Sequence, residues 1–288
     1  MKQRSSEESK RFLKSFLTRN EARLGLSIVF VFLAVSIIIT ITGKSLLPYD
    51  PVKQNVGPIL ASPTMAHLFG TDNLGRDVFS RIVIATPNDL VVSFIVIASS
   101  FLIGIVLGAI AGFWGGILDE ILMRSTDVIF AIPALILAMS IAVILGPSLV
   151  HMMYALMIIW WPPYARLARG EALQVSQKNF IESAKTSGTN TLTILKKHLI
   201  PNILNPMLAY ATLDIGTVVV VYAGLSYLGL SVQPPTPDWG AMVSAYQDYL
   251  ISAPWLPLLP AVIIALVVIG FSLLGNALRD TIESQNIS

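Results

Sequence analysis

The stretch ESAKTSG, from Glu182 to Gly188, is polar and lies between two strongly apolar parts of the chain. Residues 128–165 carry no charged side chain, and residues 199–237 carry only Asp214. A chain this apolar would be expected to join two membrane helices by a short loop. The long connection from Arg166 to Asn202 instead reads as two short helices on the membrane surface. We therefore expect a docking site for a soluble partner here.

Composition places the whole chain in the membrane. Hydrophobic residues make up 54% of the sequence and charged residues 12%, whereas soluble domains carry about 25% charged residues. Long apolar runs with few charges predict an all-α polytopic membrane protein. The net charge of +2 gives no indication of nucleic-acid binding. Cysteine is absent, which excludes disulfides and thiolate chemistry in this sequence.

The uncharged runs predict six transmembrane helices, because about 20 apolar residues cross a bilayer as a helix. The interruption Gly146-Pro147-Ser148 is typical of a turn and divides one long run into two spans. The predicted spans are 25–43, 90–113, 126–145, 149–166, 203–230 and 258–278. They make a single permease domain over 25–288, with loops 44–89 and 231–257 on one side. Residues 1–24 and 167–202 lie on the other.

The distribution of basic residues predicts which side is cytoplasmic. Only Lys44, Lys53, Arg76 and Arg81 of the 19 lysines and arginines fall in the two long loops 44–89 and 231–257. Since cytoplasmic loops carry the excess of lysine and arginine, both termini and the 167–202 segment are expected in the cytoplasm. The predicted location is the plasma membrane, crossed several times.

The polar segment itself has helix signals. Asn179 is a good N-cap and Glu182 follows at capping-box spacing, while Gly188 fits a C-cap with positive φ. A second short helix over 192–200 is expected to end at Pro201. On spacing alone two interpretations stay open: Glu182 caps its own helix, or the helix and its glycine turn form a knob that fits a partner's groove.

The same residues resemble a known motif. Glu182, Ser183, Ala184, Gly188 and Pro201 match the spacing of the "EAA" loop of binding-protein-dependent ABC importer permeases, with Ser183 replacing alanine. A further match, to the G-T-D-x-x-G-R-D signature of the dipeptide/oligopeptide/nickel permeases, is carried by Gly70, Thr71, Asp72, Gly75, Arg76 and Asp77. The blocks LSYLGL (225–230), QPPTPDWG (233–240) and LRD (278–280) also resemble that family. The order of blocks is similar to that of its C-type subunit.

This resemblance implies a type I ABC importer transmembrane fold. It implies a second homologous permease subunit, two ABC ATPase subunits that hold ATP and Mg, an external solute-binding protein, and surrounding membrane lipid. The 182–201 motif would be the segment that couples to the ATPase. The chain would bind no cofactor, contact no nucleic acid and not be an enzyme itself. Peptides are the family's default solute, with oligosaccharide or nickel as alternatives.

Candidate pathway residues are less clearly marked. Asp214 is the one acid in the interior of a predicted span, and intramembrane carboxylates are functional by default. Tyr222 stands where many family members have glutamate, and Trp160 and Trp161 precede two prolines that can break a helix. Asp214 could instead lie near the cytoplasmic end and pair with water or a lysine. A different class of function, an ion-gradient-driven secondary transporter with Asp214 as coupling site, also stays open.

Of three further sequence patterns, one predicts helix packing, while the other two predict no binding site. Gly104, Gly108, Gly112 and Gly116 recur every four residues, which favours close helix packing. The tripeptide GKS at 43–45 resembles the end of a P-loop, but Ile38 stands where the first glycine belongs. The three histidines are far apart, so no metal site is expected.

Overall fold

The computed structural model describes residues 12–287, so four basic residues of the predicted cytoplasmic segment 1–24 (Lys2, Arg4, Lys10 and Arg11) lie outside the described residues. The described chain is helical, and its one β-bridge joins Thr71 to Asp77. The α-helices are α2 (Asn20–Thr42), α3 (Val78–Trp114), α4 (Gly116–Phe130), α5 (Ala134–Leu145), α6 (Leu149–Ser176), α7 (Asn179–Thr186), α8 (Thr191–Ile194), α9 (Ile200–Tyr227), α10 (Trp239–Tyr246) and α11 (Trp255–Ile287). Short helices of other types are η1 (Gly43–Leu46), the π-turn η2 (Leu195–Leu199) and η3 (Gln247–Tyr249).

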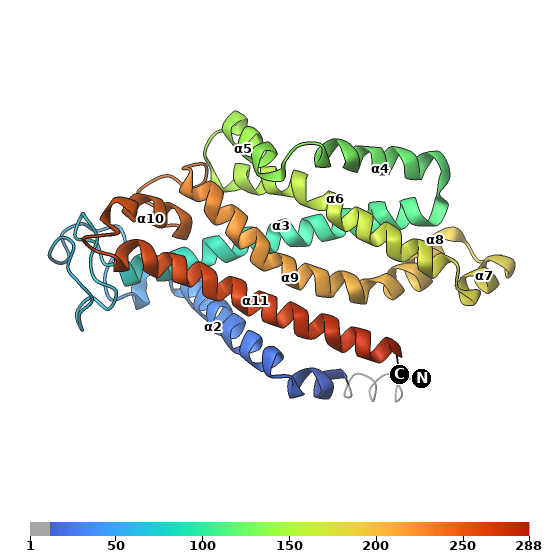
Figure 1. Ribbon diagram of the computed structural model, residues 1–288, viewed down its shortest axis with the longest axis horizontal. Coiled ribbons are helices and arrows are strands. Elements are labelled where there is room, and N and C mark those ends of the chain that lie inside the picture. Colours follow the sequence, from blue (N-terminus) through green and yellow to red (C-terminus); the bar gives the residue numbers. More distant parts are fainter. Residues whose placement is uncertain (1–11, 288) are drawn as a thin grey trace.

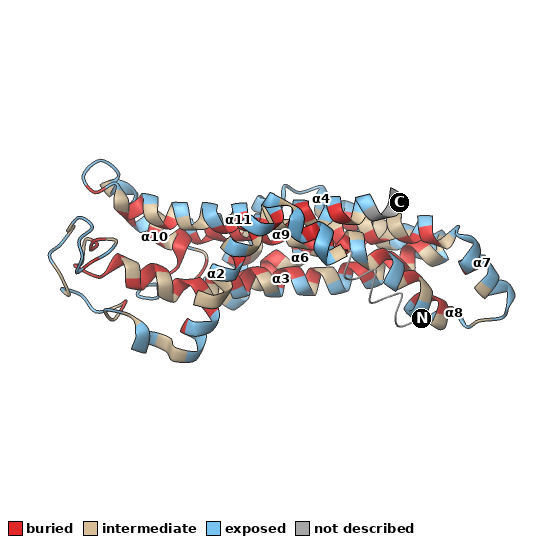
Figure 2. Ribbon diagram, turned by 90° about the horizontal axis from the view of Figure 1, so that it is seen from below, coloured by how far each residue is buried: buried red, intermediate tan, exposed pale blue. Residues whose placement is uncertain are grey.

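Five long helices, α2, α3, α6, α9 and α11, run along the long axis of the molecule (Figure 1). Helices α7 and α8 project beyond one end, which we call the α7 end. The loop before α3 and helix α10 form the opposite end, which we call the α10 end. The start of α2 and the end of α11 both lie toward the α7 end. Figure 2 shows buried residues along the inner helices and mostly exposed residues on α7.

The glycine row brings α3 and α6 into close contact. A Cβ added at Gly104 would lie 2.3 Å from the Tyr164 Cβ, and one at Gly108 would lie 2.2 Å from the Ala165 carbonyl oxygen. Gly112 meets Ala172 in the same way. The packing prediction is confirmed for these three glycines. Gly116 differs, because it lies at the start of α4 with φ +61° and open space around it.

The all-α polytopic fold is confirmed, although its spans differ from the predicted ones. Within residues 12–287, four helical runs are long and apolar enough to cross a membrane: 20–46, 78–114, 191–227 and 255–284. The predicted span 126–145 is broken, since α4 and α5 meet at an angle of 84°. Pro133 begins the second piece, and proline disfavours helix in the residue before it. Helix α6 extends ten residues beyond the predicted end at 166, to Ser176, and contains two prolines.

Two further boundaries correct the sequence prediction. The loop predicted at 44–89 ends at Asp77, because α3 already begins at Val78. The predicted second short helix does not end at Pro201. A continuous helical run covers 191–227, and Pro201 lies in the first turn of α9 directly after η2. Proline has no N–H to donate to the preceding turn, and here that turn is the π-turn η2. Similarly, α11 begins at Trp255 rather than 258, and α10 lies inside the predicted loop 231–257.

Candidate functional site

Helix α7 is held firmly on one side and free on the other. Ile181 is fully buried and belongs to the same core as Ile194 and Leu199, while Glu182 and Ser183 are exposed. The Lys185 ammonium lies 4.8 Å from the centre of the Phe113 ring, which links α7 to the end of α3. The buried face fixes the position of the helix, and its polar face remains available.

The ends of α7 correct one cap prediction and confirm the other. The N-cap is Lys178 rather than Asn179, and it makes no side-chain capping bond, so the capping box does not form. At the other end Gly188 has φ +73°. Its N–H donates to the Lys185 carbonyl, and the Thr189 N–H donates to the Ala184 carbonyl, both at 3.1 Å. This pair of bonds is a Schellman motif, which needs a left-handed residue at the position of Gly188.

The six residues of the 70–77 motif are brought together at the α10 end. Asp72 is fully buried and accepts hydrogen bonds from the Arg76 Nε at 2.7 Å and from the Tyr246 hydroxyl at 2.9 Å. Asp77 caps α3 through the Ser80 N–H at 2.8 Å. Gly70 and Gly75 both have positive φ. The motif is therefore a compact turn that joins the loop, the start of α3 and helix α10.

Tyr222 belongs to a second polar cluster at the α10 end. Its hydroxyl donates to the Asp238 Oδ2 at 2.6 Å, and Ser226 and Ser231 also donate to that carboxylate. The Trp239 N–H donates to the buried Asp89 at 3.1 Å. Sequence reasoning missed Asp89 and Asp238. Asp89 was missed because it was assigned to the end of the predicted loop 44–89.

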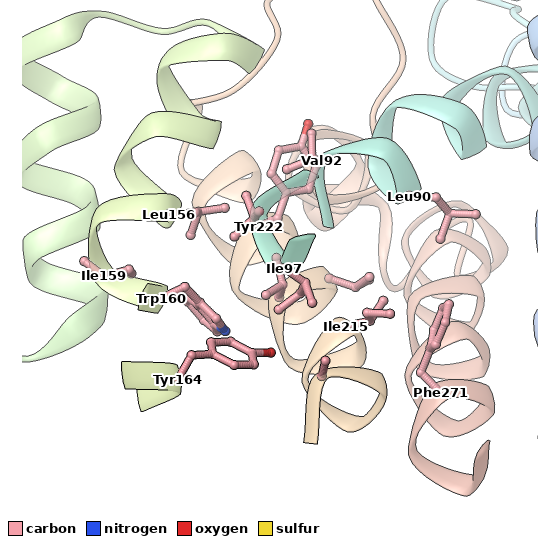
Figure 3. Close-up of a cluster of buried hydrophobic side chains, with 14 of the residues drawn as sticks. Leu90, Val92, Ile97, Leu156, Ile159, Trp160, Tyr164, Ile215, Tyr222 and Phe271 are labelled. Carbon is pink, nitrogen blue, oxygen red and sulfur yellow. The ribbon is translucent and has the colours of Figure 1, made fainter. Parts of the chain in front are cut away.

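Asp214 lies on α9, is partly buried, and faces α6. The indole Nε1 of Trp160 donates to its Oδ2 at 2.6 Å, and the Tyr164 hydroxyl donates to the same oxygen at 3.2 Å. Figure 3 shows Trp160 and Tyr164 side by side on α6, pointing toward α9. Two predicted pathway residues, Trp160 and Asp214, therefore meet directly. Trp161 is half-buried, and Tyr222 lies two turns further along α9.

The alternative for Asp214 was pairing with water or a lysine, and its lysine part does not hold among the described residues. None of the ion pairs in the described part of the chain, counted to 4.0 Å, includes the Asp214 carboxylate. Its neighbours are aromatic: the Tyr210 ring packs edge-to-face on Tyr164 with centroids 5.2 Å apart. Tyr164 and Tyr210 were missed by sequence reasoning, although each stands one helical turn from a predicted residue.

A cleft between α6, α9 and α11 begins near the α7 end. Its inner part has a volume of about 450 Å³ and ends at Tyr210 and Leu213. Its outer part, of similar size, begins at Lys178 and Pro201. The two parts share Glu171, Gln174, Pro206 and Ile282. No group of three histidine or acidic residues that could hold a metal ion occurs among residues 12–287.

The chain matches known transport proteins over most of its length. Residues 104–286 match the family model described as "Binding-protein-dependent transport system inner membrane component". The chain is 37% identical over 253 residues to the probable D,D-dipeptide transport system permease DdpC of Escherichia coli strain K12, covering 88% of this chain and 85% of that protein. It is 37% identical to the dipeptide permease DppC of Alkalihalophilus pseudofirmus, covering 91% of this chain and 85% of that protein.

Other matches agree on the family and the fold. The glutathione permease GsiD of Pectobacterium atrosepticum is 36% identical, with 88% of this chain and 84% of that protein covered. An inward-facing structure of the MetNI methionine ABC transporter matches with a TM-score of 0.57 at 20% identity, over 70% of this chain and 97% of that chain. These relatives are permeases of importers rather than enzymes. The chain is a multi-pass member of the binding-protein-dependent transport system inner membrane component family, which comprises importer permeases.

Proposed function

We propose that this permease imports peptides as one transmembrane subunit of an ATP-driven complex. The observation that carries the proposal is its similarity to permeases named for dipeptide, D,D-dipeptide and glutathione transport, over 88–91% of the chain. Oligosaccharide and nickel, the alternatives from the motif resemblance, are not named among these relatives. An ion-gradient-driven carrier is disfavoured by the same similarity. Such a carrier works without ATPase subunits, so α7 would have no ATPase to contact.

The proposed orientation places the α7 end in the cytoplasm and the α10 end outside. The segment at the α7 end carries Lys178, Lys185, Lys196 and Lys197, which agrees with the positive-inside rule. Both termini are then cytoplasmic, with residues 1–24 preceding one permease domain over 25–288. The turn at 70–77 and helix α10 face the external solute-binding protein.

Helix α7 with its glycine turn is proposed as the contact to the ATPase. Glu182, Ser183 and Ala184 lie on a short helix anchored by buried Ile181, and Gly188 closes that helix. The helix is joined to α6 on one side and to the continuous run 191–227 on the other. A displacement of α7 is therefore passed to two long helices that line the cleft. Pro201 lies where this run enters the bundle.

The proposed complex contains a second homologous permease, two ABC ATPase subunits and an external solute-binding protein. ATP and Mg are bound by the ATPase subunits. ATP binding brings these subunits together and moves both coupling helices, which opens the pathway outward to the docked binding protein. Hydrolysis reverses the movement, and the cleft beside α9 again faces the cytoplasm.

The test is uptake by proteoliposomes that carry the complete complex. Labelled alanyl-alanine should accumulate only with its binding protein and with ATP on the ATPase side. Gly188→Trp and Glu182→Pro should abolish uptake while the complex still inserts, and Lys196→Ala, a neighbouring basic residue, should not. Uptake driven by a proton or sodium gradient without the ATPases would overturn the proposal, as would normal uptake by both α7 variants at equal expression.

A further inference from the structure

The carboxylate of Asp214 is an unusual group for the interior of a membrane protein. Its Oδ2 is held by two neutral donors, Trp160 and Tyr164, and no cationic side chain of the described chain pairs with it. A charged side chain at this depth is costly unless another group compensates it. Asp214 is only partly buried, so a compensating group can arrive from outside the chain.

The aromatic rings around Asp214 narrow the chemistry of that group. Trp160 and Tyr164 donate their N–H and O–H groups to the carboxylate, and the Tyr210 ring packs edge-to-face on Tyr164. Ring faces attract cations, with tryptophan the strongest, and a carboxylate accepts hydrogen bonds from an ammonium group. Aromatic rings with one carboxylate therefore suit an organic ammonium, whereas a small inorganic cation prefers several oxygen ligands.

The cleft ends beside this group of residues, at Tyr210, whose ring packs on Tyr164. Its inner end is lined by Tyr210 and Leu213, which are one helical turn and one residue from Asp214. Along it the Arg279 Nε pairs with Glu283 at 2.8 Å, so the charge of that arginine is balanced locally. Glu171 lines both parts of the cleft and has no ion-pair partner in the described part of the chain. The one unpaired charge among the described residues that line the inner cleft is thus that of an acid, Glu171.

We propose that Asp214, with Trp160, Tyr164 and Tyr210, forms an intramembrane binding site for the primary ammonium group of the transported solute. This inference rests on the proposed peptide uptake and extends it, because it assigns recognition of the free amino terminus to the permease itself. A solute whose amino group is blocked would lose the attraction to Asp214.

The variants follow from the hydrogen bonds. Asp214→Asn keeps an oxygen acceptor for Trp160 and Tyr164 but removes the charge, whereas Asp214→Glu keeps the charge. Binding is measured on the purified complete complex without nucleotide or binding protein, where the cleft faces the cytoplasm. The probes are alanyl-alanine amide, which carries one positive charge, and its neutral N-acetyl form. A change in tryptophan fluorescence reports binding. The chain has five tryptophans, and loss of the change in Trp160→Phe would assign it to Trp160.

The wild type and Asp214→Glu should bind the cationic probe saturably, and Asp214→Asn should bind it at least about tenfold more weakly. The acetylated probe should bind weakly to all three. Equal binding of both probes, unchanged affinity in Asp214→Asn, or no saturable binding would overturn the inference. So would an equal response to sodium or potassium chloride. ATP-driven uptake is measured in parallel. If the wild-type complex binds the cationic probe but does not take up peptide, the proposed function is contradicted. If it takes up peptide but its binding does not depend on the probe's charge, only the ammonium site is contradicted.

Discussion

The Tyr246 hydroxyl donates a 2.9 Å hydrogen bond to Asp72, which lies 174 residues earlier in the chain. The bond ties helix α10 to the 70–77 turn. Both side chains are fully buried, so the phenyl ring left by Tyr246→Phe would deprive a buried carboxylate of one donor. We expect this variant to lose about 1.5–3 kcal/mol of stability, as for hydrogen bonds to charged groups.

Thermal unfolding of the purified protein would measure that loss. Tyr249→Phe is the matched control, since Tyr249 is half-buried in the same region and its hydroxyl has no hydrogen-bond partner among the described residues. Equal melting temperatures for Tyr246→Phe and the wild type would show that the bond contributes nothing.

The same tyrosine predicts a dependence on alkaline pH. Burial, together with the nearby Asp72 carboxylate, raises the pKa of Tyr246 from 10.0 to about 12. The folded state therefore keeps its proton at a pH where the unfolded state has lost it, and stability falls as the pH rises through this interval. The stability difference between the wild type and Tyr246→Phe should be constant below pH 10 and shrink between pH 10 and 12. A difference that stays constant up to pH 12 would contradict the shift.

Glycine substitutions should have opposite effects on two packed helices. Gly108→Ala places a methyl group 2.2 Å from the Ala165 carbonyl oxygen, so α3 and α6 must separate. Overpacking of this kind costs about 1–3 kcal/mol. Gly170→Ala on α6 meets nothing within 4 Å and should be neutral or stabilising by up to about 1 kcal/mol. Melting temperatures of the two variants in one detergent would compare them, and equal effects would argue against the close contact.

The Asp238 carboxylate is expected to be structurally indispensable. It accepts hydrogen bonds from Tyr222, Ser226 and Ser231, and it caps α10 through the Ala241 N–H at 3.1 Å. Asp238→Ala leaves the buried hydroxyls of Tyr222 and Ser226 without this acceptor, at about 1–3 kcal/mol for each unsatisfied group. Ser231, by contrast, can still donate to the Ser226 Oγ. We expect low yields of folded protein on size-exclusion chromatography, whereas Asp248→Ala, an exposed position, should behave as the wild type. Wild-type yield and stability for Asp238→Ala would refute this role.

The features that the sequence predicted correctly depend on residues close together in the chain. The four-residue spacing of Gly104, Gly108 and Gly112 predicted a packed helix face, and the sequence position of Gly188 predicted its positive φ, because both depend on neighbours in the chain. The bond between Trp160 and Asp214 joins residues 54 positions apart. Composition marked both residues as candidates, but only the packing of α6 on α9 brings them together.

The boundaries failed for a related physical reason. Span prediction from uncharged runs stopped at Asp89, yet α3 continues to Val78 with Arg81 and Asp89 buried inside it. Arg81 donates to the Pro51 carbonyl at 2.9 Å, and Asp89 accepts from Trp239. These partners come from distant parts of the chain, so a polar residue that bonds inside the protein cannot be told by its sequence alone from one that faces water.

Pro201 and the π-turn before it give the last prediction. Proline lacks the N–H that would bond the Lys197 carbonyl in a regular helix, and η2, over residues 195–199, widens the helix at this point. Pro201→Ala restores that donor, which favours a regular helix through residues 191–227 and removes the widened turn. Since a π-turn changes the angular relation of the two flanking segments, α7 should turn relative to α9.

The restored helix bond should raise the stability slightly. The number of peptides carried per ATP should fall, because α7 no longer has the orientation that couples the ATPase contact to the cleft. Measuring uptake and hydrolysis together in proteoliposomes tests this, with Pro254→Ala as the control, since Pro254 is exposed, precedes α11 and lines neither part of the cleft. A Pro201→Ala complex with an unchanged ratio of transport to hydrolysis would mean that the widened turn does not set the position of α7.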